Sequence, residues 1–77
     1  MKPASYIVYH VLRKIGLRRQ DILSGKEFKD ELGLDSIEII YMVNLIESKL
    51  NISIPDNEIP KLVNIEKTVS YLERRIS

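Results

Sequence analysis

No cysteine occurs in this chain of 77 residues, and that absence restricts the fold more than any other feature of the sequence. Neither disulfides nor a thiolate-bound metal can hold the chain together, and nothing points to an oxidising compartment, so the cytoplasm is expected. Because a chain this short buries little surface, its core must be small. With 44% hydrophobic residues and charges of mixed sign, residues 1–77 are predicted to form one compact domain.

Apolar residues recur at helical spacing in three stretches. The first runs from Pro3, a residue suited to a first helical position, to about Ile15, where Gly16 ends it. The second runs from Ser36 to about Leu50. In it, one face is expected to be buried and another exposed: Ile40, Val43, Ile46 and Leu50 on the buried face, and Glu38, Tyr41, Asn44 and Ser48 on the exposed face. The third contains Ile65, Val69, Leu72 and Ile76.

Polar residues mark where the helices begin. Asp35 and Glu38 stand three positions apart, which predicts a capping box at the start of the second long helix. Asp56 is expected to cap a short turn through Ile59, and Asn64 to cap the last helix. These caps predict three principal helices and one short one.

Residues 17–35 are aperiodic and predict a long ordered loop, with Phe28 as its main hydrophobic anchor. A connection of this length in so small a domain is unusual. Such loops commonly have a function or contain a short helix, and the sequence favours neither outcome over the other.

Residues 31–38 read ELGLDSIE, and this stretch resembles the signature (D/E)-L-G-x-D-S-L-(D/E) of the acyl carrier proteins, with Ile37 in place of leucine. The resemblance extends through Phe28, through Ile-Pro-Asp at 54–56 and through Tyr-Leu at 71–72. It implies an all-α fold: an up-down four-helix bundle with a short third helix and a long loop between helices one and two.

The resemblance implies that Ser36 carries a covalent 4'-phosphopantetheine arm derived from coenzyme A, and that Asp35 presents this serine to a phosphopantetheinyl transferase. It also implies a carrier that is itself no enzyme, and no metal site is expected. The position of Ser36 at the start of a helix agrees with a phosphate ester there, because the unpaired N–H groups of a helix start stabilise an anion. The alternative is that Ser36 is a second capping residue behind Asp35. The only histidine is His10, so no Ser-His-acid set can form near the motif.

The resemblance also implies docking along the second long helix, where the family is usually strongly acidic. Here fewer acids occur, and Lys49 adds an opposing charge. Five residues are predicted to contact partners: Ile37, Glu38, Tyr41, Met42 and Glu47. The apolar and aromatic members are expected to dominate, because charges at an interface rim mainly affect association rate. The expected partners are the transferase and an acyl-activating enzyme or synthase, acting on a monomer.

The sequence does not identify the acyl group or the pathway. The chain could serve fatty-acid, lipid or polyketide synthesis, or it could be a specialised carrier for aminoacyl or secondary-metabolite chemistry. An alternative from a different class of protein is a non-enzymatic interaction module that binds through its basic first helix. Residues 1–20 contain no acid and five basic residues: Lys2, Arg13, Lys14, Arg18 and Arg19. Such a helix could bind nucleic acid or anionic lipid, although a solvated helix face is commoner. We expect no nucleic-acid partner, and no stretch has the length of a membrane span.

Overall fold

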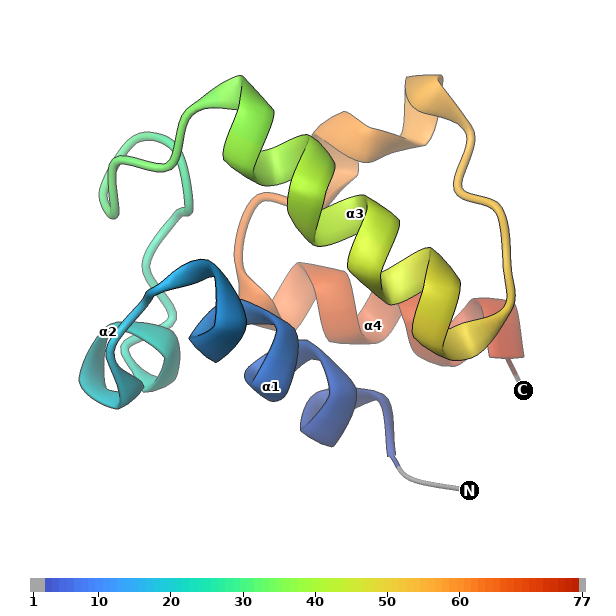
Figure 1. The fold of residues 1–77 in the computed structure, drawn as a ribbon, viewed down its shortest axis with the longest axis horizontal. Coiled ribbons are helices and arrows are strands. Elements are labelled where there is room, and N and C mark those ends of the chain that lie inside the picture. Colours follow the sequence, from blue (N-terminus) through green and yellow to red (C-terminus); the bar gives the residue numbers. More distant parts are fainter. Residues whose placement is uncertain (1–2, 77) are drawn as a thin grey trace.

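Five helical segments follow one another in the computed structural model, which describes residues 3–76 (Figure 1). Their bounds are α1 Ala4–Ile15, α2 Arg19–Leu23, α3 Ser36–Leu50, the 3-10 helix η1 Asp56–Lys61 and α4 Ile65–Ile76. The all-helical prediction is confirmed, since residues 3–76 contain no strand. The predicted count of four is not confirmed, because α2 lies within the expected loop. In this range no helix combines the length and apolar character needed to cross a membrane.

The first long helix ends where the sequence predicts. Gly16 has φ 122°, a conformation that costs a glycine far less than other residues, and its N–H donates to the carbonyls of Leu12 and Arg13. At the other end, Pro3 occupies the N-cap position rather than the first helical position. The chain therefore leaves α1 abruptly and turns into α2.

The core lies between the three long helices, with α1 packed against both α3 and α4 (Figure 1). From α3 it takes one stripe of buried side chains: Ile39, Met42, Val43 and Ile46. The predicted buried face of α3 is therefore wrong at Ile40, which is 52% exposed, whereas Leu50 is half-buried and packs against the core. The cause is that α3 carries apolar residues on almost every side, so that periodicity fits two neighbouring faces.

The connection from α1 to α3 is held by Phe28, as predicted. Its side chain is 1% exposed, its N–H donates to the Val63 carbonyl at 2.8 Å, and its carbonyl accepts from the Leu34 N–H at 2.8 Å. Ile22 of α2 is buried in the same core. These contacts fix the loop that leads into α3, although the loop has little regular structure.

At the start of α4 the capping prediction is confirmed, because Asn64 Oδ1 accepts from the Lys67 N–H at 2.8 Å. The prediction for Asp56 is wrong: Pro55 holds the N-cap position of η1, and no side chain caps that helix. η1 and α4 are joined instead through Tyr71, whose hydroxyl donates to Glu58 and accepts from Arg75. Burial and the bond to Glu58 raise the pKa of Tyr71.

The buried side of α4 also differs in part from the prediction. Leu72 is buried as expected, but Val69 and Ile76 are only half-buried. Thr68 and Tyr71 are buried instead, and Thr68 satisfies its hydroxyl by donating to the Asn64 carbonyl at 2.7 Å. A helix with polar groups that are satisfied internally can bury them at little cost, which apolar periodicity does not detect.

Candidate functional site

Ser36 is the first residue of α3 and is exposed. The preceding Asp35 has extended backbone geometry and caps the helix: its Oδ1 accepts from the Glu38 N–H at 2.8 Å, while Glu38 Oε1 accepts from the Asp35 N–H at 3.1 Å. The predicted capping box is therefore present. Because both bonds cross the first turn, they fix the backbone on either side of Ser36.

The start of α3 suits an anionic ester on Ser36. Within residues 3–76, the N–H groups of Ser36 and Ile37 donate to no protein acceptor. They lie at the positive end of a helix of 15 residues. A phosphodiester on the Ser36 hydroxyl would bring its negative charge to these donors, so the residues present fit a phosphate-linked prosthetic group.

No residue at this site can activate Ser36 as a nucleophile. His10 lies on α1 and contacts the rings of Tyr6 and Tyr9, with centroid distances of 4.2 and 5.3 Å. The described part of the chain also contains no group of three His, Asp or Glu residues placed to bind a metal. Any covalent modification of the Ser36 hydroxyl would therefore need activating groups from another protein.

The turn that leads into Ser36 depends on Gly33, whose φ is 75°. A side chain would be strained in this conformation. Leu34 then points into the core and is buried, so it serves as a loop anchor and not as an exposed contact for a prosthetic arm. Together these residues deliver the chain to the start of α3 at a defined position.

A groove of about 690 Å³ begins beside Ser36 and runs along α3. Its walls come from α3, from η1, from the segments on either side of η1 and from loop residues 27–30. The loop contributes charged side chains, but most of the lining is apolar: Ile39, Ile40, Val43, Ile54, Ile59 and Val63. The sequence does not locate this groove. The one feature of the sequence that points to it is the surplus of apolar residues on α3, which leaves Ile40 52% exposed beside the buried stripe.

Glu47 lies half-buried at the groove and is already engaged. Its Oε2 accepts from the Ile54 N–H at 2.7 Å, which joins α3 to the segment before η1. The carboxylate therefore satisfies a backbone donor that has no other partner among residues 3–76. This use differs from the predicted role of Glu47 as a free docking charge.

The other predicted partner contacts separate into exposed and buried residues. Ile37 is 78% exposed and Tyr41 is 43% exposed, so both are accessible on α3. Met42 is fully buried, and its prediction as a docking contact is wrong. It lies three residues after Ile39 on the stripe that faces the core, whereas Tyr41 is rotated to the outer side of the helix.

Replacing Asp35 with alanine should weaken both the helix and its modification. The variant loses the bond to the Glu38 N–H, and loss of an N-cap costs about 1 kcal/mol of unfolding free energy. A less well fixed Ser36 should also be modified more slowly. Urea unfolding and the initial rate of modification measure the two effects, with Glu73→Ala on the exposed side of α4 as control. Stability and rate both equal to those of the unchanged chain would contradict the expectation.

Known proteins support the interpretation of this geometry. Residues 5–72 match the family model described as "Phosphopantetheine attachment site". The chain is 38% identical over 66 residues to an acyl carrier protein of Exiguobacterium sp. strain AT1b, covering 86% of this chain and 84% of that relative. It is 35% identical to the acyl carrier protein of Exiguobacterium sibiricum over the same shares of the two chains.

Proposed function

The chain belongs to the acyl carrier protein family, and we propose that Ser36 is the residue to which its 4'-phosphopantetheine is attached. Members of this family are carriers that other enzymes modify and load, and are not enzymes themselves. The observation that carries the assignment is the position of Ser36, which is exposed at the first residue of α3 and lies at the groove.

The chemistry divides between the prosthetic group and the protein. The bound arm supplies a thiol for thioesters, which the cysteine-free chain lacks. On the protein side, the Ser36 hydroxyl oxygen holds the phosphate as an ester, and the N–H groups of Ser36 and Ile37 stabilise its negative charge. The bond from Glu38 to Asp35 keeps this helix start in place. In the proposal, the transferase recognises the backbone at this capped start of α3.

The groove supports a second part of the proposal, that an acyl group can rest along α3 between encounters with enzymes. Its volume, about 690 Å³, lies in the range of pockets that hold small molecules. The mainly aliphatic walls favour fatty-acid or polyketide chains over aminoacyl groups, because burial of apolar surface is the gain available there. A specialised carrier for aminoacyl or secondary-metabolite chemistry is the second candidate.

Residues 1–77 act as a single monomeric carrier domain in the cytoplasm, a setting that the absence of cysteine favours. In this view α1, α3, η1 and α4 are the four helices of an up-down bundle, and α2 is an additional turn in its long loop. Its partners are a phosphopantetheinyl transferase and an acyl-activating enzyme or synthase.

Intact mass spectrometry tests the assignment directly. The purified chain is incubated with coenzyme A and a broad-specificity phosphopantetheinyl transferase, and a single phosphopantetheinyl increment is expected. Peptide mapping should locate it to Ser36. An unchanged mass with every transferase tried, or an increment on another serine, would refute the proposal.

Docking should depend on the exposed apolar surface of α3. Ile37→Ala removes a side chain that is 78% exposed and adjacent to Ser36, so it should raise the KM of the transferase several-fold with little change in stability. Leu23→Ala is the matched control, because Leu23 is similarly exposed on α2. Glu47→Ala should mainly lower stability, since Glu47 bonds the Ile54 N–H. A larger docking effect from Glu47→Ala than from Ile37→Ala would show that this surface is misjudged.

A further inference from the structure

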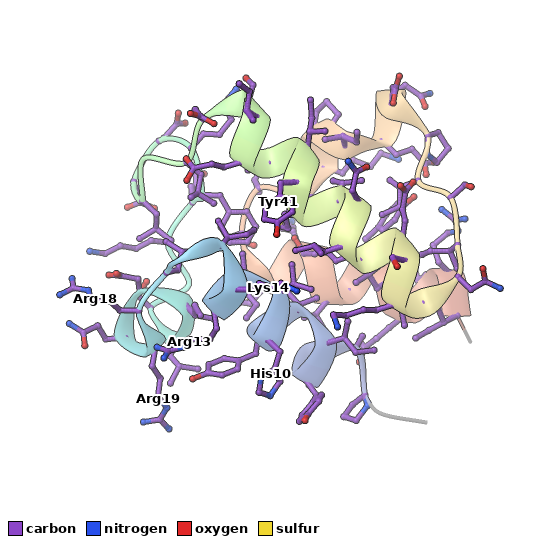
Figure 2. All side chains as sticks on the ribbon, in the orientation of Figure 1. His10, Arg13, Lys14, Arg18, Arg19 and Tyr41 are labelled. Carbon is purple, nitrogen blue, oxygen red and sulfur yellow. The ribbon has the colours of Figure 1, made fainter. Side chains whose placement is uncertain are left out.

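Four exposed cations lie on α1 and around its junction with α2: Arg13, Lys14, Arg18 and Arg19 (Figure 2). Arg18 pairs with Asp21, with 3.2 Å between Nε and Oδ2. The other three form no ion pair with any residue in the range 3–76. Lys2, the fifth basic residue of this region, lies outside the described residues. The α1 side of the molecule therefore carries positive charge that the fold does not neutralise.

Both acids of α3 are held in place by backbone donors of this chain, and each carboxylate keeps its negative charge. The Glu38 carboxylate accepts from the Asp35 N–H, and the Glu47 carboxylate accepts from the Ile54 N–H. The one cation of α3, Lys49, forms no ion pair within the described part of the chain. Among the described residues α1 thus contributes cations and no acid, whereas α3 carries charges of both signs.

Of these cations, Lys14 is the one that lies toward the surface proposed for docking, while Arg13, Arg18 and Arg19 lie nearer α2 (Figure 2). α1 packs directly against α3, and Lys14 lies on the same side of the molecule as Tyr41 in Figure 2. His10 precedes Lys14 by four residues and therefore lies on the same stripe of α1. One partner surface can therefore cover both Tyr41 and Lys14 (Figure 2).

Helix stability explains only part of this arrangement. Arg13 and Lys14 fall in the last turn of α1, where cations interact favourably with the helix dipole. Arg19, however, is the first residue of α2, where the dipole disfavours a cation. An external anionic surface would offset the charges of Arg13, Lys14 and Arg19, which no acid among residues 3–76 neutralises.

We propose that the exposed surfaces of α1 and α3 form one docking face, and that the enzymes it fits present an acidic surface to its α1 side. This inference rests on the proposed attachment at Ser36 and specifies the chemistry of the partner. The position of Lys14 on the same side as the exposed aromatic ring of Tyr41 (Figure 2) favours a protein partner over a lipid or nucleic-acid surface. Charge complementarity at such a rim sets the association rate and its dependence on salt.

Two phosphopantetheinyl transferases serve as probes, one with an acidic and one with a basic carrier-facing surface. Their kcat/KM is measured from low to high salt with Lys14→Glu and with the double variant Arg13→Glu/Lys14→Glu. Reversing Lys14 should lower kcat/KM of the acidic probe about three- to tenfold at low salt, and the double variant should lower it further. Both variants should raise the kcat/KM of the transferase whose carrier-facing surface is basic. Arg74→Glu is the matched control, because Arg74 is exposed in the last turn of α4, and it should change neither.

Equal effects of Lys14→Glu and Arg74→Glu, or no effect of either, would overturn the inference. Circular dichroism verifies folding, and Lys14→Gln provides a milder variant if the reversal unfolds the chain. Salt-sensitive binding to phosphatidylcholine–phosphatidylglycerol vesicles or to duplex DNA that is lost in the double variant would assign the cations to those ligands instead, and would also overturn it. The final mass increment is read separately: if Ser36 is never modified, the proposed function fails, whatever the charge effects.

Discussion

Ser36→Ala is expected to abolish the phosphopantetheinyl increment completely while leaving the chain folded. No other hydroxyl stands at the capped start of α3, and alanine is the best helix former. The capping bonds between Asp35 and Glu38 do not use the Ser36 side chain and should persist. Intact mass after incubation with coenzyme A and transferase measures the loss, and far-ultraviolet circular dichroism measures the helix content.

Ser48→Ala is the matched control, because Ser48 is exposed on the same helix, and this variant should be modified as completely as the unchanged chain. A residual increment in Ser36→Ala would place the attachment on a different side chain. Loss of helical signal in Ser36→Ala would give Ser36 a structural role in the fold, beside or instead of the proposed attachment.

Phe28→Ala should produce the largest loss of stability among substitutions in the loop, about 3–5 kcal/mol of unfolding free energy. The ring is 1% exposed and belongs to the core, so its removal leaves a cavity that neighbouring side chains can fill only partly. The same residue links the loop to Val63 and Leu34 through its backbone. Because folded domains are stable by only about 5–15 kcal/mol, this variant should be close to unfolding at room temperature.

Urea unfolding monitored by circular dichroism tests this expectation, with Leu23→Ala as control because Leu23 is exposed on the neighbouring α2. Phe28→Leu should recover part of the lost stability, since it restores most of the apolar volume. A cost for Phe28→Ala no larger than that of Leu23→Ala would mean that Phe28 does not anchor the loop in solution.

The sequence by itself determined the features that depend on short-range contacts. The end of α1 at Gly16, the start of α3 at Asp35 and the start of α4 at Asn64 follow from caps whose partners lie within a few residues. The exposed position of Ser36 follows in turn from the cap before it. The long helices and the helical class of the fold are predictable for the same reason.

Only the tertiary structure decided which side of α3 faces the core. Apolar residues surround this helix, so local periodicity could not separate the stripe that contains Met42 from the face that contains Ile40. The choice is made by the packing of α3 against α1 and by the placement of η1, contacts between residues far apart in the chain. The bond from Ile54 to Glu47 and the groove beside Ser36 arise from those same distant contacts. Helical spacing shows which residues share a face, but the position of a neighbouring helix determines whether that face is buried.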